Sequence, residues 1–107
     1  MKLLLDENIP HQLYRDFPSE HPAFSVTYMQ WRGVSNGEFL KKMQENLFGG
    51  LVTWDRSIAF QQNFSKYPVT VFVFHTSGND YEVLKPLVEK IIAVIEKGAG
   101  AGPIVIT

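Results

Sequence analysis

The chain contains no cysteine, no run of like charges and no long apolar stretch. Without cysteine there are no disulfides and no thiolate ligands, so a metal ion would have to bind oxygen or imidazole. The net charge is −1 at pH 7, so no global field attracts nucleic acid, which would need a local basic patch or a metal that offsets the acids. No stretch approaches the roughly 18 apolar residues of a membrane span, and Asp6 interrupts the first apolar run before a signal peptide could form. These absences predict a cytoplasmic protein with no membrane partner.

Short apolar segments alternate with helical patterns along the 107 residues. The pattern predicts strands at residues 2–6, 23–29, 51–54, 69–75 and 103–107. Helices are expected from Pro10 to about residue 17, from Ser35 or Asn36 to 46, over 55–64 and over 81–97, where Pro86 either kinks the helix or begins it. The order βαβαβαβαβ implies a mostly parallel sheet with helices on both faces. We therefore expect an α/β fold, a single domain over 1–107 that forms a three-layer α/β/α sandwich with about five strands.

Two of the apolar strands end in an acid. Asp6 and Glu7 follow Leu3-Leu4-Leu5, and Asp55 follows the segment 51–54. Ligands of open α/β sheets bind outside the carboxyl ends of the strands, so these acids are expected to meet at one rim. A carboxylate cluster there is a candidate site for a hard divalent cation such as Mg²⁺. The alternative is structural, with Asp6, Asn8 or Asp55 capping the helix that follows.

Further side chains join this rim as candidates. Glu38 lies in the first turn of the second helix, where it can reach the rim or simply favour the helix dipole. Thr53 shares a face of its strand with Asp55 and could orient a carboxylate or a phosphate, although a β-branched residue also suits any strand. Arg56 and Lys41 are among the nearest cations, and they either hold phosphates or form a solvated face.

Three segments together suggest a family. Residues 3–10 (Leu-Leu-Leu-Asp-Glu-Asn-Ile-Pro), 33–40 (Gly-Val-Ser-Asn-Gly-Glu-Phe-Leu) and 51–58 (Leu-Val-Thr-Trp-Asp-Arg-Ser-Ile) resemble the three motifs of small PIN-like proteins, distant relatives of VapC-type ribonuclease toxins. The resemblance implies an α/β/α sandwich with a pocket for Mg²⁺ or Mn²⁺, hydrolysis of RNA, a cognate antitoxin and often a homodimer. The resemblance leaves Asp6 and Asp55 as the motif acids. Our own hypothesis assigns catalysis to Asp6, Asp55 and Glu38, metal binding to Asp6, Asp55, Glu7 and Asn36, and substrate binding to Thr53, Arg56 and Lys41.

The chain departs from that family at positions that bear on activity. Asn36 stands where the family usually has an aspartate, Ser57 stands where the second aspartate of the third motif is expected, and Ile58 replaces a phenylalanine. Two metal ions in a nuclease need several carboxylates to offset their charge. The substitutions therefore predict weaker metal binding and an activity that is low or lost.

Two other classes of function stay open. A phospho-acceptor receiver domain also places acids after the first strand, an aspartate after the third and a hydroxyl after the fourth, as Asp6, Glu7, Asp55 and Thr76 or Ser77 do here. Against it, no lysine follows the fifth strand to hold a phosphoryl group. The other alternative is a binding module that kept the fold and lost catalysis.

Overall fold

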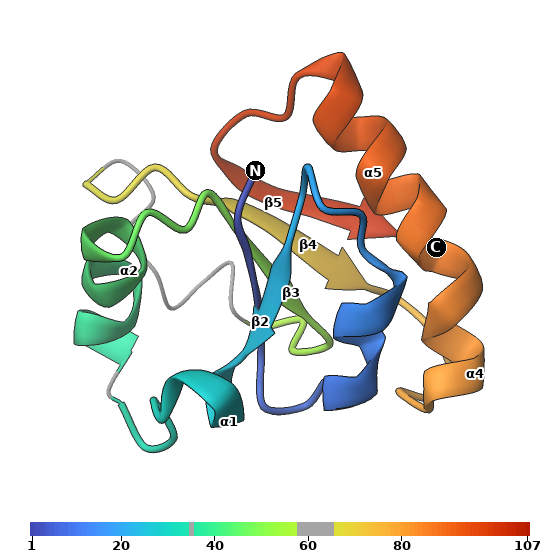
Figure 1. The fold of residues 1–107 in the computed structure, drawn as a ribbon, viewed down its shortest axis with the longest axis horizontal. Coiled ribbons are helices and arrows are strands. Elements are labelled where there is room, and N and C mark those ends of the chain that lie inside the picture. Colours follow the sequence, from blue (N-terminus) through green and yellow to red (C-terminus); the bar gives the residue numbers. More distant parts are fainter. Residues whose placement is uncertain (35, 58–65) are drawn as a thin grey trace.

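The computed structural model describes residues 1–34, 36–57 and 66–107, with residues 36 and 37 described in their backbone only. Its centre is a sheet of five parallel strands in the order β2-β1-β3-β4-β5 (Figure 1). The strands are β1 (Leu3–Leu5), β2 (Ala23–Ser25), β3 (Gly50–Thr53), β4 (Thr70–Phe74) and β5 (Gly102–Ile106). The predicted α/β fold with a parallel sheet of about five strands is confirmed.

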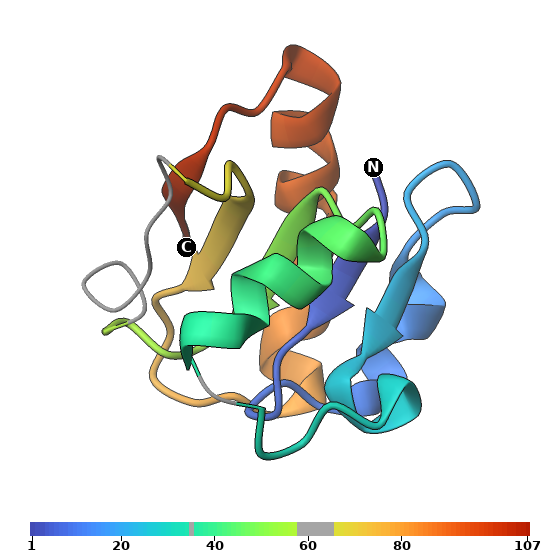
Figure 2. The ribbon, with the colours of Figure 1, turned by 90° about the vertical axis from the view of Figure 1, so that its left-hand side faces the viewer.

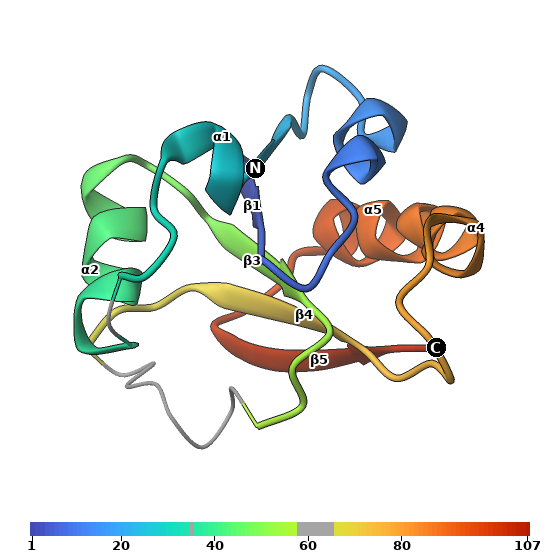
Figure 3. The same cartoon turned by 90° about the horizontal axis from the view of Figure 1, so that it is seen from below.

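Helices cover both faces of this sheet. The described helices are η1 (His11–Asp16), α1 (Val26–Met29), α2 (Asn36–Glu45), α4 (Tyr81–Leu84), η2 (Lys85–Leu87) and α5 (Val88–Lys97). Figure 2 shows α2 in front of the strands and α5 behind them, and Figure 3 shows the same two layers from below. Within the described ranges, no helix has the length and apolar character needed to span a membrane.

The strands β1, β3 and β4 contribute to two separate hydrophobic cores, whereas β5 contributes to only one of them. On one face Leu3 and Leu5 pack with residues of η1, α4 and α5 such as Leu13 and Ile91. On the other face Leu4 packs with residues of α1 and α2. Successive side chains of a strand point to opposite faces, so a strand buried on both faces must be apolar throughout. That requirement is why β1 appears in the sequence as an uninterrupted leucine run.

The structure differs from the prediction for residues 23–29. Only Ala23–Ser25 is a strand, and the chain then forms α1. The Ser25 hydroxyl accepts a hydrogen bond of 3.0 Å from the Tyr28 amide, which caps the new helix. Gln30, with φ of 62°, ends it. The prediction of a strand over 26–29 is therefore wrong, because a local cap outweighs the strand preference of Val26.

Two other predicted helices also need refinement. The helix that follows Pro10 is a 3₁₀-helix, η1, and the predicted helix 81–97 is divided into α4, η2 and α5 around Pro86. Proline lacks the N–H that a continuous helix requires. Most of the predicted helix 55–64 lies outside the described residues; Arg56 and Ser57 form a turn.

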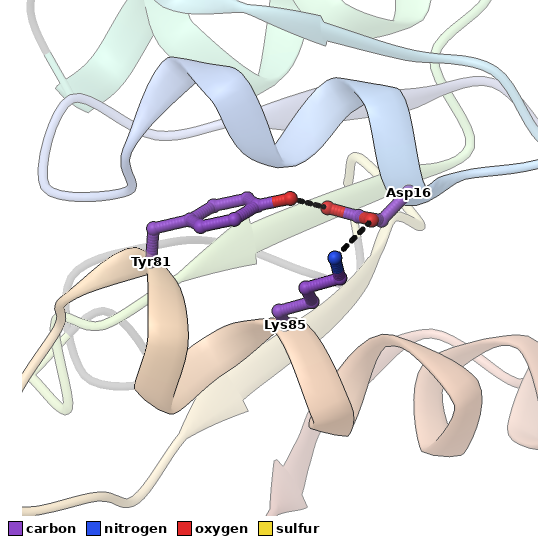
Figure 4. A network of polar contacts seen from close by, with 3 residues as sticks. All are labelled: Asp16, Tyr81 and Lys85. Carbon is purple, nitrogen blue, oxygen red and sulfur yellow. Dashed lines mark hydrogen bonds and ion pairs between the residues drawn. The ribbon is translucent and has the colours of Figure 1, made fainter.

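Polar contacts join η1 to α4. Tyr81 donates a hydrogen bond of 2.7 Å to Asp16 Oδ2, and Lys85 Nζ lies 4.0 Å from Asp16 Oδ1 (Figure 4). The hydrogen bond to Asp16 is the largest cause that raises the pKa of the Tyr81 phenol above its ordinary value. These contacts hold the start of α4 and the first residue of η2 against the end of η1.

Candidate functional site

The order of the strands defines where a ligand can bind. The chain passes from β1 to β2 on one side of the sheet and later adds β3 on the other side of β1. Open α/β sheets bind ligands at such a switch point, outside the carboxyl ends of the two central strands. Asp6 directly follows β1, and its amide donates a hydrogen bond of 2.9 Å to Val52 O on β3. The acid after the first strand therefore lies at the switch point.

Thr53 is the residue on β3 that contacts Asp6. Its side chain is fully buried, with 0% exposed. Thr53 Oγ1 donates a hydrogen bond of 2.7 Å to Asp6 Oδ2, and it accepts from the Asp55 amide at 3.0 Å and from Asn8 Nδ2 at 3.5 Å. A hydroxyl has one proton and two lone pairs. The Asp55 amide and Asn8 Nδ2 occupy both lone pairs of the Thr53 hydroxyl, so its proton points to Asp6. Asp6 Oδ2 is therefore the acceptor in this hydrogen bond.

Asn8 connects three of the loops at this end of the sheet. Its Oδ1 accepts a hydrogen bond of 3.0 Å from the Trp54 amide, its Nδ2 faces Thr53, and its carbonyl accepts from Asn79 Nδ2 at 2.7 Å. The Trp54 amide can only donate, so this contact sets the orientation of the Asn8 amide. Sequence reasoning considered Asn8 only as a helix cap. The feature of the sequence that could have indicated this role is the position of Asn8 directly after Asp6 and Glu7, at the end of the first strand.

Asp6 is a carboxyl group under opposing influences. Burial is the largest cause that raises its pKa, and the charges of Glu7 and Asp55 raise it further. The hydrogen bonds from Thr53 and from the Glu7 amide, the latter 2.8 Å to Oδ1, lower it. A cation placed beside this carboxylate would favour its charged form. The site therefore offers a partly buried carboxylate whose ionisation a bound cation would stabilise.

Asp55 is held by the turn that it begins. Asp55 Oδ1 accepts hydrogen bonds from the Ser57 amide at 2.9 Å and from Ser57 Oγ at 2.6 Å. An aspartate that bonds the backbone two residues ahead forms an Asx turn. Ser57 therefore fixes the orientation of Asp55. The neighbouring Arg56 donates from Nη2 to Thr76 O at 3.4 Å, which ties this turn to the loop after β4.

The remaining predicted residues lie apart from this group. Glu7 is exposed on the same loop as Asp6, whereas Glu38 and Lys41 are exposed on α2. Asn36 begins α2. In the described part of the chain, no hydrogen bond or ion pair joins Glu38 or Lys41 to Asp6. The same part holds no group of three or more histidine, aspartate or glutamate side chains arranged to hold a metal ion.

Two hollows flank Asn8 at the switch point. The acidic hollow has a volume of about 580 Å³ and its wall includes Asp6, Glu7, Asp80 and Glu82. The arginine hollow, of about 630 Å³, is lined by Asn8, Trp54, Asp55, Arg56, Thr76 and Ser77. Asn8 also lines the acidic hollow. The two carboxylates at the ends of β1 and β3 thus open into neighbouring hollows with one shared wall.

The chain has no match among known proteins at the level of family, sequence or structure: no protein-family model, no curated protein and no solved structure matches it. An assignment of function therefore depends on the chemistry of the switch point and on the motifs of the sequence.

Proposed function

We propose that this protein is a PIN-like, divalent-metal-dependent phosphodiesterase that hydrolyses RNA. One observation supports it most: Asp6, partly buried at the β1–β3 switch point, accepts a hydrogen bond from Thr53 Oγ1, and the same hydroxyl oxygen accepts one from the Asp55 amide. Paired carboxylates at such a position suit hard cations and phosphate chemistry. The RNA substrate, the toxin role and a cognate antitoxin rest on the resemblance of the motifs to the PIN-like family.

The oxygen atoms present fit one Mg²⁺ or Mn²⁺ better than two. Each oxygen of Asp6 accepts one hydrogen bond, and a carboxylate has about four lone-pair sites in all, so each oxygen keeps a free site. Mg²⁺ is commonly held by one or two carboxylates together with water and substrate phosphates. Asp6 and Asp55 would hold the ion. When bound, such an ion activates a water molecule and offsets the charge on the phosphate.

The chain's own residues have separate roles in this proposal. Thr53 keeps Asp6 oriented as an acceptor, and Asn8 fixes the loop that carries it. Arg56, anchored to Thr76 O, has guanidinium donors left for a phosphate oxygen in the arginine hollow. Glu38 and Lys41 are secondary candidates, because both lie on α2 without a described contact to Asp6.

Two measurements test the proposal. Cleavage of a labelled single-stranded RNA is followed in the presence of Mn²⁺, and binding of Mn²⁺ to the protein is measured by calorimetric titration. We expect cleavage by the wild type to stop with EDTA, and Asp6→Asn and Asp55→Asn to lose both metal binding and cleavage. Glu96→Gln removes an exposed acid near the end of α5 and serves as the matched control with unchanged activity. Full metal-dependent cleavage by folded Asp6→Asn would rule out the proposed site.

One observation favours a second candidate, a receiver-like phospho-acceptor domain. The strand order β2-β1-β3-β4-β5 is that of the flavodoxin and receiver folds, and Asp55 follows β3 while Thr76 follows β4. However, Thr76 Oγ1 donates to Gly78 O and accepts from Trp54 Nε1. Incubation with acetyl phosphate followed by intact-mass measurement separates the two. A phosphoryl group that Asp55→Asn fails to acquire would favour the receiver, and an unchanged mass would favour the hydrolase.

A further inference from the structure

An apolar groove of about 360 Å³ runs along the edge strand β2. It is lined by His11, Tyr14, Ala23, Phe24, Ser25 and Tyr28, and is called the aromatic groove below. Among the residues that the structure describes, no strand pairs with the outer side of β2. Figure 1 shows the blue 3₁₀-helix η1 and the helix α1 on either side of β2. Side chains from both helices therefore meet over an open sheet edge.

The aromatic rings of this groove are exposed to an unusual extent. Tyr28 is 72% exposed and Tyr14 is 48% exposed. The Phe24 ring supports Tyr28, with centroids 5.7 Å apart and ring planes inclined by 36°. Neither tyrosine hydroxyl has a hydrogen-bond partner among residues 1–34, 36–57 and 66–107. Exposed aromatic rings in a groove are suited to stacking against planar groups.

Cations border these rings. The Arg15 guanidinium carbon lies 5.8 Å from the centre of the Tyr14 ring, and Lys2 Nζ lies 5.4 Å from the centre of the Phe24 ring. Neither cation forms an ion pair with a carboxylate in the part of the chain that the structure describes. Lys2 Nζ already donates a hydrogen bond of 2.8 Å to Asn46 O, so Arg15 is the cation that is available to an anionic ligand. Aromatic rings bordered by cations are the combination that binds single-stranded nucleic acid, whose bases stack and whose phosphates carry charge.

The aromatic groove is continuous with the acidic hollow. His11 and Ser25 line both of them, and Asp6 lines the acidic hollow. A chain that places one base in the groove can therefore extend its backbone past His11 toward Asp6. This continuity connects the groove to the proposed reaction site.

We propose that the aromatic groove is a base-binding subsite for single-stranded nucleic acid, with one base against Tyr28 and Tyr14. The inference rests on the proposed function for the reaction at Asp6, but its binding step is independent of catalysis. It assigns Tyr14, Tyr28 and Arg15 to substrate binding, although none of them belongs to the three sequence motifs.

The test measures binding without metal. A fluorescein-labelled single-stranded RNA octamer is titrated with the protein in EDTA and followed by anisotropy. Loss of a base–aromatic stack should raise Kd by about 5- to 140-fold, and we expect this for Tyr28→Ala and for Tyr14→Ala. Tyr28→Phe keeps the ring and should bind as the wild type does. Val105→Ala removes an exposed apolar side chain from β5, the opposite edge strand, and is the matched control.

The outcomes separate this subsite from the hydrolase proposal. Binding that Tyr28→Ala weakens supports the subsite even if no RNA is cleaved when metal is added, in which case only the hydrolase fails. Metal-dependent cleavage abolished in Asp6→Asn, with a Kd unchanged in Tyr28→Ala, supports the hydrolase and overturns the subsite. A dimer in sedimentation velocity that Tyr28→Ala converts to a monomer also overturns it, because the groove would then be an interface between copies.

Discussion

Thr53 Oγ1 donates a hydrogen bond of 2.7 Å to Asp6 Oδ2 although 47 residues separate the two along the chain. The contact forms because β1 and β3 are neighbours and Leu5 pairs with Val52. It joins the first acid of the sequence to a buried hydroxyl whose other partners are Asp55 and Asn8. The candidate site is therefore assembled by strand pairing, and each of its polar groups depends on the others.

Removal of the Thr53 hydroxyl should destabilise the fold. Thr53→Val keeps the shape of the side chain but leaves Asp6 Oδ2 and the Asp55 amide without this partner. Loss of a buried hydrogen-bonding partner costs about 1–3 kcal/mol, and we expect a fall of that size in the free energy of unfolding, measured by urea denaturation. Thr53→Ser keeps the hydroxyl and should lose less. Equal losses in the two variants would contradict a leading role of the hydrogen bonds, because Thr53→Val removes only the hydroxyl and Thr53→Ser removes only the methyl group.

The charge of Asp6 should make stability depend on pH in a particular direction. Burial raises the pKa of Asp6 above its ordinary value of 3.8, so the folded protein binds this proton more tightly than the unfolded chain does. The charged carboxylate therefore destabilises the fold. This destabilisation is absent below pH 3.8, grows as the pH rises from 3.8 to the raised pKa, and is constant above the raised pKa. The stability of Asp6→Asn relative to the wild type should therefore increase with pH.

Urea denaturation of both proteins below pH 3.8 and at neutral pH measures this change. Asparagine keeps one acceptor oxygen in place of the two that accept from the Glu7 amide and from Thr53. Both hydrogen bonds lower the pKa of Asp6 against the effect of burial, so the change with pH reports the net effect. A stability difference between the variants that stays constant with pH would contradict the predicted cost.

Gly50 should not tolerate a side chain. A Cβ at this position would lie 2.7 Å from Leu3 Cδ2 and 3.2 Å from Phe72 Cε2, both in fully buried residues. Overpacking of this kind costs about 1–3 kcal/mol, so Gly50→Ala should lower the free energy of unfolding. Gly100→Ala is the matched control, because a Cβ there meets nothing within 4 Å. Similar midpoints for the two variants in urea denaturation would contradict the close packing.

The contact between Tyr81 and Asp16 should contribute to stability below the phenol pKa and not above it. The pKa of Tyr81 is raised above 10.0, and the hydrogen bond to Asp16 is the largest cause of this shift. The folded state therefore favours the protonated phenol. The contribution of this hydrogen bond is complete below 10.0 and disappears as pH rises through the raised pKa. Tyr81→Phe should therefore melt below the wild type at neutral pH, with the difference vanishing at strongly alkaline pH. Thermal melting followed by circular dichroism measures the difference at each pH. Identical melting temperatures of the two proteins at neutral pH would contradict a stabilising role of this hydrogen bond.

The architecture was more predictable from the sequence than the site. Strands buried on both faces must be apolar, so β1, β3 and β4 appear as apolar runs, and the acid that follows β1 marks the carboxyl end of the sheet. The segment 26–29 was not predictable as a helix, because Val26 favours a strand and the deciding contact is the Ser25 cap.

The network around Asn8 lies beyond sequence reasoning for a different reason. Its partners on Thr53, Trp54 and Asn79 are distant along the chain and become neighbours only when the strands pair. The aromatic groove has the same origin, since Tyr14 and Tyr28 come from helices on either side of β2. Neither feature has a local pattern that periodicity or motif spacing could detect.

The hydrogen bond from the Asp6 amide to Val52 O has a consequence for motion. It places the first residue of the site within the ladder between β1 and β3, the central pair of the sheet. Amide protons in such a pair exchange with solvent chiefly when the whole domain opens. A ligand that binds Asp6 would therefore slow hydrogen exchange across the central strands, and its occupancy could be read from amides far from the carboxylate itself.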